Sequence, residues 1–151
     1  ANNALSECLD RTSFITVSYF IFDNKTKKIE FSRAGHCPTL YYSARGKTVR
    51  FLEDNGLGLG ILRDEQFDAF VDTTEMKYWS GDVVLLYTDG ITEAKNSSNE
   101  EFGYERLKDF LEKNAFYSAE YMKEELLKTL YGFSESSNLE DDITMLVIKV
   151  K

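Results

Sequence analysis

The stretch Val83-Val84-Leu85-Leu86-Tyr87-Thr88-Asp89-Gly90 joins a strongly apolar run to a turn that bears a carboxylate. An apolar run of this length, bounded by turn residues, is typical of a buried strand. A second apolar run, residues 143–150, directly follows the acidic pair Asp141 and Asp142. Each predicted strand therefore has carboxylates at one end, where side chains leave the core and can converge on a ligand. Gly90 is expected to let the backbone turn sharply behind Asp89.

Carboxylates gathered at strand ends suit hard divalent cations. Mg²⁺ and Mn²⁺ prefer oxygen ligands and keep several waters in their coordination shells. The alternative interpretation is structural, because Asp and Gly are also the ordinary residues of turns. Spacing alone does not separate a metal ligand from a turn residue at Asp89, or from a loop acid at Asp141.

Five longer motifs occur in a fixed order along the chain. They are RAGHCP (33–38), LGLGI (57–61), YTDGITEA (87–94), FGYERL (102–107) and DDITML (141–146). Together they resemble the PPM metal-dependent serine/threonine phosphatases, in the SpoIIE-like branch that includes bacterial sporulation and stress-response regulators. The resemblance extends over residues 14–150, and five motifs in order are far more specific than any one of them.

The resemblance implies a chemistry and a set of site residues. Members of the family use two Mn²⁺ or Mg²⁺ ions to hydrolyse phosphoserine or phosphothreonine, and a water that bridges the metals attacks phosphorus. Carried over to this chain, Asp89 is a metal ligand and Asp141 a second, while Asp142 orients Asp141 or takes its place. The implied neighbours of these ligands are Thr88, Gly90, Glu93, His36 and Gly60. For Glu93 the alternative is a helix-start acid, and for His36 it is a structural hydrogen bond within its loop.

The chain departs from the family in its first part. The family's domain has an earlier half that supplies further ligands from an acid on an early strand and from an Asp-x-x-Gly-type motif. Nothing before Phe14 matches either feature. We therefore expect residues 1–151 to be a single domain, the C-terminal portion of a phosphatase catalytic domain, incomplete on its N-terminal side and inactive or nearly so. The rival interpretation is a non-catalytic pseudophosphatase that serves as an interaction module in signalling.

Composition restricts the partners. The net charge of −8 argues against nucleic acid, whose phosphates require clusters of Lys and Arg. No run approaches the about 20 apolar residues of a membrane span, so no membrane contact is expected. Two cysteines, Cys8 and Cys37, do not form a disulfide framework and favour a reducing cytoplasm. The resemblance implies a phosphorylated regulatory protein of the anti-anti-sigma type as the partner. A free strand edge of an incomplete sheet would favour an oligomer.

Periodicity and turn residues predict the elements. Strands are expected at residues 14–23, Lys28–Ala34, Thr39–Ser43, Thr48–Leu52, 67–74, Val83–Tyr87 and 143–150, and helices at residues 1–10, 104–114 and 119–131. We expect Ser118 to cap the last helix and Gly132 to end it, with a polar loop leading to Asp141. This order gives an α+β fold with antiparallel sheets. The resemblance adds a β-sandwich flanked by helices, in α-β-β-α layers.

Three other side chains are candidates of lower rank. Arg33 and Arg63 are candidates for phosphate contact, because guanidinium groups bind phosphate through two hydrogen bonds. Cys37 beside His36 suggests an activated thiol, but adjacent residues on an extended segment point to opposite faces. The glycine-rich stretch 55–60 lacks the Lys-Ser/Thr of a phosphate-binding P-loop and is expected to be a packed loop.

Overall fold

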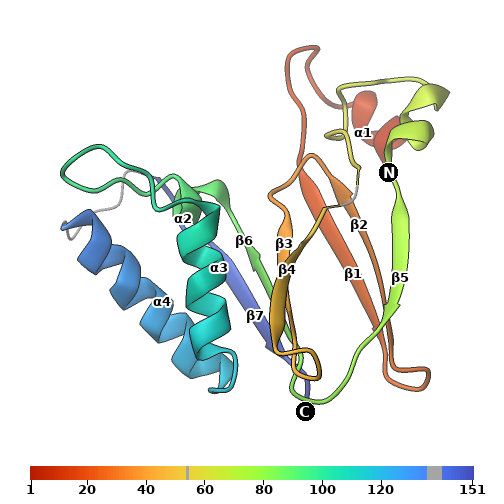
Figure 1. Ribbon diagram of the computed structural model, residues 1–151. Helices are drawn as coiled ribbons and strands as arrows, with labels where there is room; N and C mark the ends of the chain where they lie inside the picture. The colour runs from red at the N-terminus through yellow and green to blue at the C-terminus, as the bar shows by residue number, and fades with distance from the viewer. Residues whose placement is uncertain (54, 136–140) are drawn as a thin grey trace. The chain divides into compact units, whose positions relative to one another are not determined.

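The computed structural model describes residues 1–53, 55–135 and 141–151 (Figure 1). The chain divides into two compact units. The first comprises Ala1–Pro38 and Glu53–Tyr78, and the second comprises Thr39–Leu52 and Trp79–Lys151. Each unit contains one antiparallel sheet, so the expected α+β class is confirmed. The expected single domain, residues 1–151, stays a prediction.

The first unit is built on a three-stranded sheet in the order β1-β2-β5. Its elements are α1 (Asn2–Ser6), β1 (Val17–Asp23), β2 (Lys28–Ala34), the 3₁₀ helix η1 (Glu65–Phe70) and β5 (Thr73–Lys77). Phe20 and Phe31 lie opposite each other in the β1–β2 hairpin and stack with ring centroids 5.4 Å apart. Ile29, on the central strand, is completely buried. Alternation of apolar and polar residues thus gives this sheet one packed face.

The β1–β2 turn is held by Asp23. Its carboxylate accepts hydrogen bonds from the Thr26 hydroxyl (2.7 Å) and from the Lys25 amide (2.8 Å). The Thr26 hydroxyl bond, followed by the backbone bonds, lowers the pKa of Asp23. Asp is a common turn residue for this reason, since its side chain replaces backbone hydrogen bonds that the turn lacks.

The second unit is built on a four-stranded sheet in the order β4-β3-β6-β7. Its elements are β3 (Thr39–Ser43), β4 (Thr48–Leu52), β6 (Val83–Tyr87), α2 (Asp89–Thr92), α3 (Gly103–Asn114), α4 (Ala119–Ser134) and β7 (Met145–Lys149). In Figure 1, α3 and α4 lie on one side of this sheet, where α3 contacts β4 and α4 contacts β7. Leu107, Leu126 and Leu130 are the completely buried leucines of the two helices. The apolar β6 is a central strand of the sheet, as its run of apolar residues predicts.

A buried carboxylate, Asp82, fixes the start of β6. Its two oxygens accept hydrogen bonds from the amides of Ala44 and Trp79, each at 2.8 Å, and from the Tyr41 hydroxyl. Burial raises the pKa of Tyr41, and the hydrogen bond to Asp82 raises it further. Three donors satisfy a carboxylate that is 0% exposed, as a buried charge requires.

The strand predicted at residues 67–74 is wrong. Asp64 accepts a hydrogen bond from the Gln66 amide (3.0 Å) and starts η1, so the chain turns helically before β5 begins at Thr73. Phe67 is buried, and Phe67 and Phe70 are three residues apart, a spacing that matches one turn of a 3₁₀ helix and not the alternation of a strand. A local side-chain cap therefore overrides a weak pattern of period two.

The predicted end of α4 is also wrong. Ser118 caps the helix as expected and accepts a hydrogen bond from the Tyr121 amide (3.1 Å). The helix passes through Gly132 and ends at Ser134, and Glu135 then adopts a left-handed conformation with φ 52°. Tyr121 is 39% exposed, whereas the next residue, Met122, is buried. The rest of the predicted loop, residues 136–140, lies outside the described residues.

No helix in the described part of the chain is both long enough and apolar enough to cross a membrane.

Candidate functional site

The first acidic motif sits where β6 passes into α2. Thr88 is the extended N-cap residue, and Asp89 is the first residue of α2. Asp89 is exposed and Gly90 is buried behind it. The strand therefore ends by presenting one carboxylate to the surface, directly beyond the buried core of the sheet.

Gly90 brings the two acidic motifs together. A Cβ built on Gly90 would lie 2.6 Å from the carbonyl oxygen of Asp142 and 3.6 Å from the Cβ of Asp141. Only a residue without a side chain allows this approach. Gly90 has no positive φ, so the expected reason for the glycine, a sharp backbone turn, is corrected to close packing.

Thr88 ties the same two segments by hydrogen bonds. Its amide donates to the Thr144 carbonyl (3.0 Å), and its hydroxyl accepts from the Thr144 amide (3.0 Å). The hydroxyl also donates to the Asp142 carbonyl (3.3 Å). The pairing of β6 with β7 is thereby extended to the base of both acidic motifs.

The two carboxylates have similar surroundings. The amide of Gly90 donates to Asp89 Oδ1 (3.1 Å), and the amide of Asp142 donates to Asp141 Oδ1 (2.7 Å). Within the described residues, Oδ2 of Asp89 and of Asp141 has no hydrogen-bond partner. Each carboxylate is thus held through one oxygen by the amide of the following residue. The expected role of Asp142, to orient Asp141 or take its place, stays a prediction.

A small cleft of about 90 Å³ lies beside Asp141. It is lined by Gly90, Glu93, Ala94, Lys95, Glu101 and Asp141. Its carboxylates offer the oxygen donors that Mg²⁺ and Mn²⁺ prefer. No group of three or more His, Cys, Asp or Glu side chains among the described residues is placed to hold a metal ion. Metal binding by Asp89 and Asp141 therefore stays a prediction.

His36 and Gly60 belong to the first unit. The imidazole Nδ1 lies 3.1 Å from the Thr16 hydroxyl, and the His36 carbonyl accepts a hydrogen bond from Arg33 Nη1 (2.7 Å). Gly60 has φ 90° and donates its amide to Asn2 Oδ1 (2.8 Å). These are the contacts of loop-fixing residues, and a place beside the carboxylates stays a prediction for both.

Arg63 has a structural task in the same unit. Its guanidinium donates to the carbonyls of Gly60 (3.1 Å), Ser6 (3.1 Å) and Leu9 (3.0 Å), and also to that of Asp10. These bonds fix the chain that follows α1, whose last carbonyl groups need donors. The expected phosphate contact of Arg63 therefore competes with four hydrogen bonds to backbone carbonyls.

The sequence does not predict two lining residues of the cleft, Lys95 and Glu101, nor the contacts of Thr88. Thr88 is predicted as a neighbour of Asp89, and the structure adds that its hydroxyl joins the two motifs. Lys95 and Glu101 line the cleft because they pair across a short hairpin. The turn residues of NSSN (96–99) between them are a hairpin signal that was available in the sequence.

Comparison with known proteins shows a matching family and several relatives of this chain. The family model described as stage II sporulation protein E (SpoIIE) matches residues 1–151. Phosphoserine phosphatase RsbU of Bacillus subtilis is 29% identical over 99% of this chain and 43% of its own length.

Two solved structures share the fold. The SiaA-PP2C domain of Pseudomonas aeruginosa has a TM-score of 0.74 at 22% identity, over 90% of this chain and 52% of that one. The Mn-presoaked phosphatase domain of SpoIIE from Bacillus subtilis has a TM-score of 0.65 at 18% identity, over 89% and 56%. The chain spans less than half the length of RsbU and little more than half of either structure.

Proposed function

Because this chain belongs to the SpoIIE family, we propose that it is the C-terminal portion of the catalytic domain of a metal-dependent protein serine/threonine phosphatase. The observation that supports the proposal is the close approach of Gly90, the residue after Asp89, to the Asp142 carbonyl and to the Cβ of Asp141. In Asp89 and in Asp141, Oδ1 accepts a backbone hydrogen bond and Oδ2 is left as a possible ligand. Carboxylate oxygens of this kind suit a divalent cation.

Each residue has a definite task in this proposal. Asp89 and Asp141 would hold Mn²⁺ or Mg²⁺ through Oδ2, while the amides of Gly90 and Asp142 keep the carboxylates oriented. Thr88 would maintain the spacing between the two ligands. When bound, the metal ions supply an activated water and stabilise the charge that develops on the phosphoryl group. The remaining ligands would come from residues outside this set.

The substrate class follows from the relatives. RsbU is named a phosphoserine phosphatase, and we propose the same reaction here, the hydrolysis of phosphoserine or phosphothreonine on a bacterial regulatory protein. A partner of the anti-anti-sigma type in the cytoplasm is the specific proposal. Manganese is a reasonable first metal because the SpoIIE phosphatase domain was studied after Mn soaking.

The test is phosphate release from a phosphoserine peptide with and without Mn²⁺. We expect no turnover by residues 1–151 alone, and Mn²⁺-dependent turnover by a chain extended upstream with the missing acids. In that extended chain, Asp89→Asn and Asp141→Asn should each abolish activity, while Asp109→Asn, an exposed acid on α3, should not.

Two outcomes would contradict the proposal. Robust turnover by residues 1–151 alone would show that the site completes itself and that the expected inactivity is wrong. An extended chain that carries the upstream acids, binds Mn²⁺ and still releases no phosphate would favour the pseudophosphatase alternative.

A further inference from the structure

The cleft beside Asp141 contains one basic side chain. Its lining comprises three carboxylates, from Glu93, Glu101 and Asp141, and the ammonium-bearing Lys95. Lys95 is half-buried, whereas Glu93, Glu101 and Asp141 are exposed. Lys95 is thus the one cationic residue among the lining residues of an otherwise acidic cleft.

Backbone pairing fixes the position of Lys95. Lys95 and Glu101 form an antiparallel bridge, flanked by hydrogen bonds from Asn96 N to the Glu100 carbonyl (3.0 Å) and from Phe102 N to the Ala94 carbonyl (2.8 Å). Residues that face each other in an antiparallel pair direct their side chains to the same side. This explains why Lys95 and Glu101 both line the cleft.

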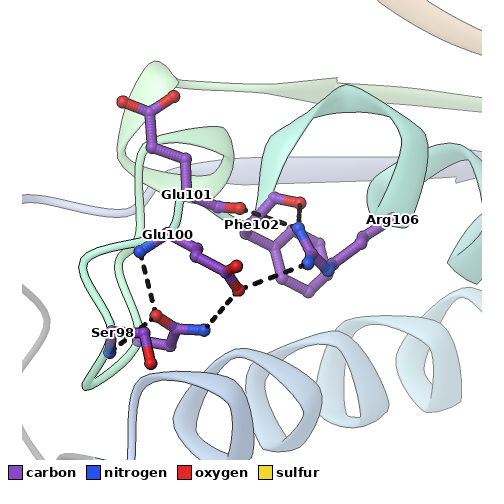
Figure 2. Close-up of polar contacts among 6 residues, drawn as sticks. Ser98, Glu100, Glu101, Phe102 and Arg106 are labelled. Carbon is purple, nitrogen blue, oxygen red and sulfur yellow. Dashed lines mark hydrogen bonds and ion pairs between the residues drawn. The ribbon is translucent and has the colours of Figure 1, made fainter.

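The tip of the hairpin is held by a side chain, Asn96. Its Oδ1 accepts from the amides of Ser98 (3.0 Å) and Glu100 (2.9 Å), and its Nδ2 donates to Glu100 Oε2 (3.0 Å). Figure 2 shows these bonds reaching Ser98 and Glu100. Local side-chain bonds of this kind make a four-residue turn well defined.

The other side of the hairpin is held by Arg106 on α3. Its Nη1 donates to the carbonyls of Glu101 (2.8 Å) and Phe102 (3.1 Å), and its Nη2 lies 3.9 Å from Glu100 Oε2 (Figure 2). The guanidinium also lies over the ring of Phe133, 4.9 Å from its centroid. The strand of the hairpin opposite Lys95 is thus anchored to both long helices of the unit.

We infer that Lys95 is the side chain of this site that contacts the phosphate group of the substrate, on a rim held in place by Asn96 and Arg106. The inference rests on the proposed function. A lysine ammonium is a compact positive charge that binds phosphate oxygens through charge-assisted hydrogen bonds. A metal ion held by Asp141 would offset the negative charge of the cleft, so that a phosphate group could enter it beside Lys95.

The charge of Lys95 has opposite consequences for the two ligands of the site. It attracts a phosphate dianion and repels a divalent cation held by the same carboxylates. Removal of this charge should therefore weaken phosphate binding and leave metal binding equal or tighter. A lysine that served only the local fold would affect both ligands in the same direction, because both depend on an intact site.

The experiment compares Lys95→Gln and Lys95→Arg with the wild type in the upstream-extended protein. Binding of inorganic phosphate in the presence of Mg²⁺ is followed by amide chemical shifts, and Mn²⁺ binding is followed separately by paramagnetic broadening. Lys128→Gln is the matched control, because it removes one exposed lysine from α4 in the same unit.

We expect Lys95→Gln to weaken phosphate binding about tenfold, the loss of one charge-assisted hydrogen bond, with Mn²⁺ affinity unchanged or higher. Lys95→Arg should retain most of the phosphate affinity, and Lys128→Gln all of it. Unchanged phosphate affinity in Lys95→Gln would overturn the inference, and so would a parallel loss of Mn²⁺ affinity or an absence of phosphate binding in the wild type.

Turnover separates this inference from the proposed function. Lys95-dependent phosphate binding without any turnover would support the inference and contradict the phosphatase proposal. The opposite result is turnover of a phosphoserine peptide in which Lys95→Gln changes neither the KM for the peptide nor the affinity for phosphate. It would support the proposed phosphatase function and overturn the role of Lys95.

Discussion

Gly90 is the residue at which the two acidic segments meet. A methyl group at this position would lie 2.6 Å from the Asp142 carbonyl, a backbone atom that moves only if the segment before β7 moves. We predict that Gly90→Ala lowers the free energy of unfolding by about 1–3 kcal/mol, the usual cost of overpacking. Urea denaturation measures this loss, and Mn²⁺ binding should weaken with it.

The matched control is Gly132→Ala. Gly132 lies inside α4, and an added Cβ there meets nothing within 4 Å. Replacement of a helix-interior glycine by alanine stabilises by about 0.5–1 kcal/mol. Equal effects of the two substitutions would show that the close approach at Gly90 is unimportant.

Tyr41 and Asp82 give a prediction on pH. The pKa of Tyr41 is raised in the folded chain, first by burial and then by its hydrogen bond to Asp82. The folded state therefore keeps the phenol proton at a pH where the unfolded state releases it, so stability is full below about pH 10 and falls as pH rises above it. Tyr41→Phe should be less stable near neutral pH and should lose less stability between pH 9 and about 11.

Thermal unfolding over that pH range provides the measurement. Tyr131→Phe is the control, because Tyr131 is 44% exposed and belongs to the same unit. It should follow the wild type at every pH. An alkaline loss of stability that is as large in Tyr41→Phe as in the wild type would assign the effect to other groups.

The pairing of β6 with β7 carries both acidic motifs, and Thr88 extends that pairing by two side-chain hydrogen bonds. We predict that Thr88→Val, which keeps the shape and removes the hydroxyl, leaves the Thr144 amide without its acceptor. The expected loss of stability is about 1–3 kcal/mol. Mn²⁺ affinity should fall as well, because the spacing between Asp89 and Asp141 is no longer fixed.

Thr129→Val is the control for Thr88→Val. It tests whether the effect depends on the position of the Thr88 hydroxyl or follows from the loss of any threonine hydroxyl. The Thr129 hydroxyl donates only to the carbonyl of Glu125, one turn earlier in its own helix (2.7 Å), a bond that adds little to stability. This variant should bind Mn²⁺ like the wild type. A similar loss of Mn²⁺ affinity in both variants would remove the special role of Thr88.

The elements show what the sequence determines locally. The hairpin strands β2, β3 and β4 begin and end where the sequence predicts, because alternation and turn residues are local signals. β6 is equally clear, since its apolar run is buried by tertiary structure and bounded by polar residues. The strand predicted at residues 67–74 fails because the Asp64 cap and burial of Phe67 favour a 3₁₀ turn. Gly132 does not end α4, because the helix continues to Ser134 and Phe133 packs edge-on against Phe102, with ring centroids 5.3 Å apart.

In the candidate site, as in the elements, local signals can be predicted from the sequence and long-range contacts cannot. The candidate ligands Asp89 and Asp141 can be predicted from the motifs. The contact that joins their two segments is made by Gly90 and Asp142, which are distant in the chain, and it could not be predicted. Lys95 enters the cleft through a hairpin whose anchors, Asn96 and Arg106, act on backbone atoms. Such bonds leave no periodic pattern in a sequence, so sequence reasoning names ligands more readily than the residues that place them.

The whole molecule raises the question of whether the two compact units unfold together. Trp79 is the only tryptophan of the chain and belongs to the second unit, while Ile29 is completely buried in the first. If residues 1–151 form one cooperative domain, Ile29→Ala should lower the unfolding midpoint reported by Trp79 fluorescence. The expected destabilisation is about 2–5 kcal/mol, the cost of a large-to-small substitution in a core.

Fluorescence and far-ultraviolet circular dichroism should then give one coincident transition, the criterion for two-state unfolding. Ile61→Ala, at a position of the first unit that is 48% exposed, should leave the midpoint nearly unchanged. If Ile29→Ala shifts only the circular dichroism and leaves the Trp79 transition in place, the units are independent domains. In that case the second unit, which holds Asp89, Asp141 and Lys95, would be expected to keep the close approach of Gly90 to the Asp142 carbonyl without the first.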